Sequence, residues 1–168
     1  AVGGHPYGPN QGRGIFRSVD GGKTFEKVLY RDENTGGGDV QIDATNSDVV
    51  YASLWESREG PWENSTWNGT NGGIFKSTDG GKSWNQLHKG LPEKIVQANL
   101  AVAPNSPGTL LAAVKTLVGS NIFRSKDSGD SWFTTTDDTR PGAGIGGGDL
   151  PIVKFDAKNP AIVYSTSI

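Results

Sequence analysis

Short apolar runs alternate with turn-forming residues along the whole chain, and one such unit occurs three times. In each copy, an apolar pair and a basic residue precede the pattern Ser-x-Asp-x-Gly-x-Ser/Thr-aromatic. A short Asp or Ser side chain accepts hydrogen bonds from backbone N–H groups within a turn, and Gly supplies a positive φ, so each unit predicts strand, tight turn, strand. The closing aromatic is expected to be buried by whatever packs beside the hairpin. The pattern residues are Ser18, Asp20, Gly22 and Phe25; Ser77, Asp79, Gly81 and Trp84; and Ser125, Asp127, Gly129 and Trp132.

A second kind of hairpin alternates with the first. Two β-rich runs at 39–43 and 49–55 are separated by a polar turn, and the same order returns at 155–164 and, more loosely, at 102–111. Together the two hairpins make a four-stranded unit, A-B-C-D, with the Ser-x-Asp turn between C and D. The spacing of the units is typical of propeller blades rather than helical repeats. The sequence therefore predicts an all-β fold, a β-propeller of four-stranded antiparallel blades.

The strand count predicts about three blades' worth of chain, cut in mid-blade at both ends. A closed propeller usually has about four to eight blades, so its partners are expected to be the remaining blades of a longer protein or further copies of this chain. The chain begins at Ala1 and is expected to be a processed or excerpted piece. Its predicted divisions are a half blade at 1–30, a blade at 31–88, a blade at 89–136 and a half blade at 137–168.

Strand direction predicts on which rim of the propeller the candidate functional residues lie. In an antiparallel blade the A–B and C–D turns lie at one end, so the long B–C and D–A connections share the other rim, where function is expected. The three Ser-x-Asp turns then have a structural role. A calcium interpretation of their Asp residues lacks the spacing of an EF-hand loop, so no metal is expected.

Two acidic residues on the loop rim are candidate catalysts. Asp39 and Asp149 each follow a Gly-Gly-Gly run directly before a predicted A strand, which would place both carboxylates at the mouth of the central channel. A carboxylate pair can perform acid–base work on a glycoside. Alternatively, the glycines only permit a sharp entry into the strand and the Asp caps the turn.

The longest connection, residues 56–72, carries Trp62 and Trp67 among polar residues. Their indole rings could stack on sugar faces with Arg58 as a polar neighbour, or fold back to hold the loop. Two other loops supply the remaining candidate ligand-binding residues, for which a hydrogen-bonding role within the loop is the alternative: His5, Tyr7 and Arg140.

Composition narrows the classes of function. The 168 residues carry 16 basic and 18 acidic side chains, a net charge of -2, so a nucleic acid partner is not expected. Without Cys, the chain has no disulfide, cysteine zinc site or thiol nucleophile. There is no run of about 18 apolar residues, so membrane insertion is not expected. No cofactor is expected.

The repeated turn resembles the Asp-box, or bacterial neuraminidase repeat, of sialidases, xyloglucanases and the luminal domain of sortilin, with Phe25 in place of the usual Trp. The stretches 4–9 and 28–36 are similar to large glycosyl-hydrolase-like or sortilin-like repeat propellers of bacteria. The resemblance implies a propeller in a secreted or periplasmic protein. Of the functions it implies, non-catalytic binding of a glycan or protein, or assembly, ranks first, and xyloglucanase-like or sialidase-like hydrolysis second.

Overall fold

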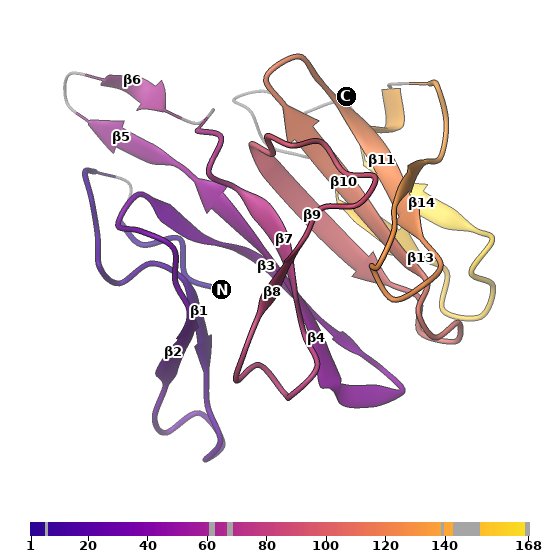
Figure 1. Cartoon of the computed structure of the whole chain (residues 1–168), viewed down its shortest axis with the longest axis horizontal. Helices are drawn as coiled ribbons and strands as arrows, with labels where there is room; N and C mark the ends of the chain where they lie inside the picture. Colours follow the sequence, from indigo (N-terminus) through magenta and orange to yellow (C-terminus); the bar gives the residue numbers. More distant parts are fainter. Residues whose placement is uncertain (6, 61–62, 67–68, 139, 143–151, 167–168) are drawn as a thin grey trace.

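The computed structural model describes residues 1–5, 7–60, 63–66, 69–138, 140–142 and 152–166, and their strands form five antiparallel sheets (Figure 1). The N-terminal hairpin comprises β1 (Ile15–Arg17) and β2 (Glu26–Leu29). Sheet I comprises β3 (Thr35–Asp43), β4 (Asn46–Glu56), β7 (Gly73–Ser77) and β8 (Asn85–Leu87), in that order. A small hairpin between β4 and β7 comprises β5 (Arg58–Gly60) and β6 (Glu63–Thr66).

Sheet II repeats the plan of sheet I. Its strands are β9 (Gln97–Val102), β10 (Leu110–Thr116), β11 (Gly119–Ser125) and β12 (Phe133–Thr134). A short 3-10 helix, η1 (Arg140–Gly142), follows, and the C-terminal hairpin comprises β13 (Val153–Phe155) and β14 (Val163–Ser165). Neighbours in sequence are neighbours in each sheet, so the predicted all-β fold with four-stranded antiparallel sheets is confirmed.

The two four-stranded sheets share one register. In sheet I, Val50 lies opposite Ser77, and in sheet II, Leu110 lies opposite Ser125. Both serines begin a Ser-x-Asp turn, so equivalent positions can be assigned residue by residue between the sheets. Among these, Tyr51 is equivalent to Leu111, and Lys76 to Arg124.

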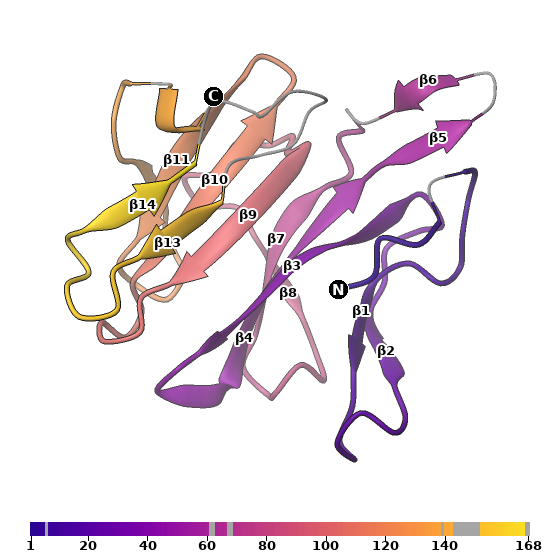
Figure 2. The same cartoon turned by 180° about the vertical axis from the view of Figure 1, so that it is seen from behind.

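The sheets follow one another in chain order, as both views of the molecule show (Figures 1 and 2), and apolar layers hold them together. Tyr51, Leu100 and Trp132 belong to the layer between sheets I and II. Ile15 and Leu54 belong to the layer between the N-terminal hairpin and sheet I. A third layer, between sheet II and the C-terminal hairpin, comprises Ala101, Leu111, Ala113, Ile122 and Val153. Each large apolar side chain fully buried in these layers contributes about 1.5–3 kcal/mol.

Local hydrogen bonds build all three Ser-x-Asp turns in the same way. In the second turn, Ser77 Oγ donates to Asp79 Oδ1 over 2.7 Å and accepts from the Gly81 N–H over 2.8 Å. Asp79 also accepts from the backbone and hydroxyl of Ser83. The first and third turns repeat these bonds.

The closing aromatics differ in burial. Trp132 is only 5% exposed because sheet I covers it, and Trp84 is half-buried beside the N-terminal hairpin. Phe25 is 63% exposed, so the expectation that its ring is buried is wrong for this copy. The reason is its place in the stack: the rings of the second and third turns lie on the preceding sheet or hairpin, whereas the N-terminal hairpin is the first element of the stack.

The glycine run before Asp39 lies inside a strand, although the sequence predicts that this strand starts only at Asp39. Strand β3 begins at Thr35, so Gly36–Gly38 lie inside it, with a bulge between Gly37 and Asp39. The physical reason is close packing of the N-terminal segment. A Cβ at Gly36 would lie 2.8 Å from the carbonyl oxygen of Gly3, and the N–H of Gly37 donates to the carbonyl of Val2.

Candidate functional site

The first strands of the two sheets and of the C-terminal hairpin, β3, β9 and β13, lie side by side (Figure 2). Two adjoining clefts open over them and share Gly38 and Asn99. The upper cleft, of about 350 Å³, is lined by Gly3, Gly4, Arg13, Gly36, Gly37, Gly38, Trp55, Ser57, Gln97 and Asn99. The lower cleft, of about 230 Å³, is lined by Gly38, Asp39, Gln41, Asn99, Leu100, Ile152, Val153 and Lys154.

Asp39 joins two sheets at the lower cleft. Its Oδ2 accepts a hydrogen bond of 2.8 Å from the backbone N–H of Leu100 on β9. Its Oδ1 accepts from the N–H of Val40 over 2.7 Å, and the side-chain amide of Gln41 donates to both oxygens. Because both carboxylate oxygens already have donors, this geometry favours a structural role for Asp39.

The register of the C-terminal hairpin identifies the residue that occupies the position of Asp39. Val163 lies opposite Phe155 as Val50 lies opposite Ile42, so the residue equivalent to Asp39 is Ile152. An apolar residue therefore occupies this position in the C-terminal hairpin. Asp149 itself lies outside the described residues.

Arg13 organises the wall of the upper cleft. The side chain is 1% exposed, and its guanidinium donates to four backbone carbonyls. Nη1 bonds the carbonyls of Asn34 and Ser57, and Nη2 those of His5 and Gly8. One buried cation thus ties the N-terminal loop to the end of β4 and to the connection before β3.

Gln97 supplies the polar centre of the upper cleft. Its side chain is 8% exposed, and across the described part of the chain its buried Oε1 has no hydrogen-bond partner. Leaving such a group unsatisfied costs about 1–3 kcal/mol. Asn99, two residues along β9, and the half-buried ring of Trp55 line the same space. The cleft therefore combines side-chain amides, an indole and glycine backbone, a set that can bind a neutral hydroxylated ligand.

Of the other predicted ligand-binding residues, those that the structure describes belong to separate segments of the chain. Trp62 and Trp67 lie outside the described residues, and Arg58 begins β5. Tyr7, 62% exposed, belongs with His5 to the loop that Arg13 holds. Arg140 belongs to η1, which packs against β11, and its guanidinium forms three hydrogen bonds with Asp138.

The turn carboxylates are strongly held in their ionised form. Hydrogen bonds from Thr24 and Ser18 lower the pKa of Asp20 to about 2, and bonds from Ser131 and Ser125 do the same for Asp127. The pKa of Asp79 is lowered in the same way, first by the hydroxyl of Ser83. Within the described ranges, no three His, Asp or Glu side chains form a group that could hold a metal ion. No helix in that part of the chain is long and apolar enough to span a membrane.

Comparison with known proteins gives one informative relative. The chain is similar to a protein named xyloglucanase from Paenibacillus sp, with 30% identity over 122 residues. These residues are 68% of this chain but 11% of the xyloglucanase. No protein-family model matches the chain.

Sequence reasoning did not select the residues of the upper cleft. Gln97 and Asn99 alternate with apolar residues in β9, and two polar residues on one side of a buried strand are the signal that could have found them. Arg13 lies between two glycines just before β1, and only the fold reveals that four carbonyls converge on it.

Proposed function

We propose that this chain is a glycan-binding segment of an extracytoplasmic Asp-box β-propeller, and that the upper cleft is the binding site. The observation that carries the proposal is the buried Oε1 of Gln97, which has no hydrogen-bond partner among the described residues and belongs to a side chain that lines a cleft with Trp55 and Asn99. A sugar hydroxyl that donates to this oxygen would remove the cost of leaving it unsatisfied.

Sheets I and II correspond in this proposal to the blades at 31–88 and 89–136, and the two hairpins to the half blades at 1–30 and 137–168. Three features support it: the shared register of the sheets, their face-to-face stacking in chain order, and the side-by-side first strands. In a propeller the first strands surround the central channel, so both clefts would open onto the channel wall.

The cleft suits a neutral glycan rather than a charged ligand. The flat indole offers an apolar surface to a sugar ring, while the two amides offer donors and acceptors to its hydroxyls. The glycine walls let backbone groups approach the ligand closely. Similarity to a protein named xyloglucanase makes a xyloglucan oligosaccharide the first ligand to test.

Hydrolysis is the second candidate, and the xyloglucanase similarity is what favours it. It would require Asp39 and Asp149 to act as an acid–base pair on the glycoside. The hydrogen bonds to both oxygens of Asp39 make binding without turnover the better-supported function. Turnover of xyloglucan that Asp39→Asn and Asp149→Asn abolish would reverse this ranking.

Calorimetric titration of the chain with a xyloglucan oligosaccharide tests the binding site. Gln97→Leu retains the bulk of the side chain and removes its acceptor, so affinity should fall about tenfold or more. Gln86→Leu, on β8 outside the cleft, is the matched control and should bind as the parent chain does. Equal affinity for the parent and Gln97→Leu would refute the site.

A further inference from the structure

The third Ser-x-Asp turn forms the site, called the seat below, that holds the side chain of Tyr51. The Tyr51 ring is fully buried in the same apolar layer as Trp132, and its hydroxyl donates to the carbonyl of Ser128 over 3.0 Å. Next to that carbonyl, a Cβ at Gly129 would lie 3.4 Å from the Tyr51 ring. A carbonyl, a glycine and an indole thus hold the tyrosine of the neighbouring sheet.

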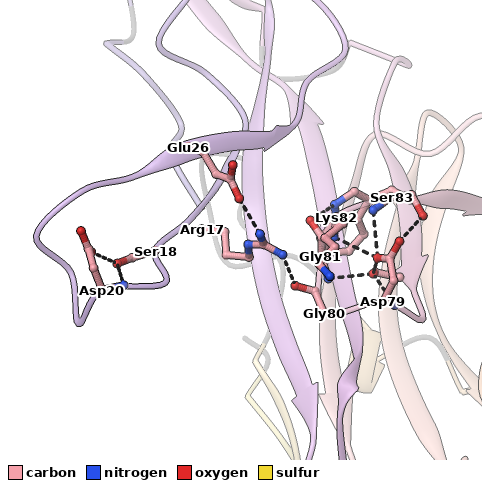
Figure 3. A network of polar contacts seen from close by, with 11 residues as sticks. Arg17, Ser18, Asp20, Glu26, Asp79, Gly80, Gly81, Lys82 and Ser83 are labelled. Carbon is pink, nitrogen blue, oxygen red and sulfur yellow. Dashed lines mark hydrogen bonds and ion pairs between the residues drawn. The ribbon is translucent and has the colours of Figure 1, made fainter.

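The second turn forms the same seat, but it is open. Gly80, Gly81 and Trp84 occupy the positions of Ser128, Gly129 and Trp132, and they border a mostly apolar cleft of about 440 Å³. The carbonyl of Gly80 accepts one hydrogen bond, from Nη1 of Arg17 over 3.0 Å (Figure 3). A carbonyl oxygen has two lone pairs, so it can accept a second donor.

Tyr164 is the residue of this chain that fits the seat. Tyr164, on β14, lies opposite Lys154 of β13. Tyr51, on β4, lies opposite Gln41 of β3 in the same way, so the two tyrosines are equivalent. The ring of Tyr164 is nevertheless 60% exposed. Within the described residues, β14 pairs only with β13, and β1 pairs only with β2, apart from a bridge between Val2 and Gly14.

We propose that a second copy of this chain docks its β14 along the edge of β1 at Phe16 and Arg17, beyond the bridge of Val2 with Gly14, and inserts Tyr164 into the open seat. The pairing of β4 with β7 gives the register of the docked strands. Tyr51 lies opposite Lys76 there, so the equivalent Tyr164 would lie opposite Arg17, which is equivalent to Lys76. The docked ring would lie on Gly81 and Trp84, and its hydroxyl would donate to the Gly80 carbonyl. The two hairpins would then form one four-stranded sheet of the same plan as sheets I and II.

The same docking accounts for a second exposed ring. Phe25 belongs to the N-terminal hairpin and is equivalent to Trp132, which sheet I covers. When the hairpin joins β13 and β14 of another copy, sheet II of that copy would cover Phe25 in the same way. The proposal rests on the blade interpretation of the fold but not on the glycan site, since self-association is measured without glycan.

Sedimentation equilibrium of the 168-residue chain tests the proposal. The parent chain should self-associate, as a closed ring of two copies or an open series. Tyr164→Phe should weaken association about fivefold through loss of one hydrogen bond, and Tyr164→Ala by about 100-fold. Tyr7→Ala, which removes a similarly exposed tyrosine from the N-terminal loop, should associate as the parent does. A monomeric parent chain, or association unaffected by Tyr164→Ala, would overturn the proposal.

Disulfide trapping tests the register, even if Tyr164→Ala fails to fold. The chain has no cysteine, so a mixture of Phe16→Cys and Ser165→Cys chains can form only introduced disulfides. These positions correspond to the facing pair Phe75 and Ala52, so a cross-linked product should form readily on mild oxidation. Val118→Cys, on the 97% exposed turn residue between β10 and β11, is the control partner. Equal cross-linking of Phe16→Cys to both partners would refute the register and the proposal with it.

Discussion

The carboxylate of Asp39 accepts a hydrogen bond of 2.8 Å from the backbone N–H of Leu100, so a side chain of β3 satisfies a backbone group on the open edge of β9. Such a bond to a charged acceptor contributes about 1.5–3 kcal/mol when both groups are partly buried. The contact links sheets I and II at the wall of the two clefts. It also gives an acidic residue at this position a structural role.

Asp39→Ala should therefore lower the free energy of unfolding by about 2 kcal/mol, and Asp39→Asn by less, because the amide oxygen can still accept from Leu100. Urea unfolding followed by far-UV circular dichroism measures the difference. Asp137→Ala, at an exposed acidic residue, serves as the control. If Asp39→Ala unfolds at the same urea concentration as the parent, the structural role is wrong.

Gly36→Ala should destabilise the chain by about 1–3 kcal/mol, because the new Cβ would lie 2.8–2.9 Å from the backbone of Gly3 and displace the N-terminal segment. Gly3→Ala is the matched control, since a Cβ there has nothing within 4 Å. Thermal melts of the two variants measure the difference. Equal melting temperatures would contradict the close packing of residues 1–3 on β3.

High pH should destabilise the layer between sheets I and II. Burial raises the pKa of Tyr51 to about 12, against the unfolded value near 10. A raised pKa means that the stabilisation is complete below pH 10 and is lost as pH rises toward 12, by about 2–3 kcal/mol. Tyr51→Phe should remove this loss while costing about 1 kcal/mol at neutral pH. If the parent chain and Tyr51→Phe lose stability equally between pH 10 and about 12, ionisation of Tyr51 is not the cause.

Low pH should open the Ser-x-Asp turns. Because hydrogen bonds lower the pKa of Asp20 and Asp127 to about 2, their stabilisation is complete above the unfolded value near pH 4 and is lost as pH falls through 2. Stability measured between pH 5 and 2 should fall steadily in the parent chain. Asp127→Asn should flatten part of that fall, and an unchanged slope in this variant would argue against the turn bonds.

The turns could be predicted from the sequence because the hydrogen bonds of their Ser and Asp side chains span four residues or fewer. The third turn, which has Ser128 in place of a glycine, keeps the same backbone conformation. Ser128 replaces the glycine found at Gly21 and Gly80, yet it adopts a φ of 59°, close to the 73° and 71° of those glycines. Strand order followed from the alternation of the two hairpin types, and this was enough to predict the four-stranded antiparallel sheets.

The cleft could not be predicted because its parts are far apart in sequence. Arg13 binds backbone carbonyls, which every residue type has, so the residue pattern does not reveal its partners. Gln97 lines a cleft only because the fold brings β3 beside β9. The repeated Gly-Gly-Gly-Asp sequence does not by itself define the register of a strand. It repeats in the chain, but pairing to the neighbouring strand, which sets the position of each side chain, places Ile152 where Asp39 lies.

The most direct test of the proposed function is an NMR titration of the 15N-labelled chain with a xyloglucan oligosaccharide, following the side-chain amide of Gln97 and the indole N–H of Trp55. The cleft predicts that both signals shift together and saturate at one dissociation constant, along with the backbone amides of Gly36–Gly38. Signals of the exposed turn at Val118 should stay unchanged. If the oligosaccharide leaves the Gln97 amide unmoved at saturating concentration, the glycan site is not the upper cleft.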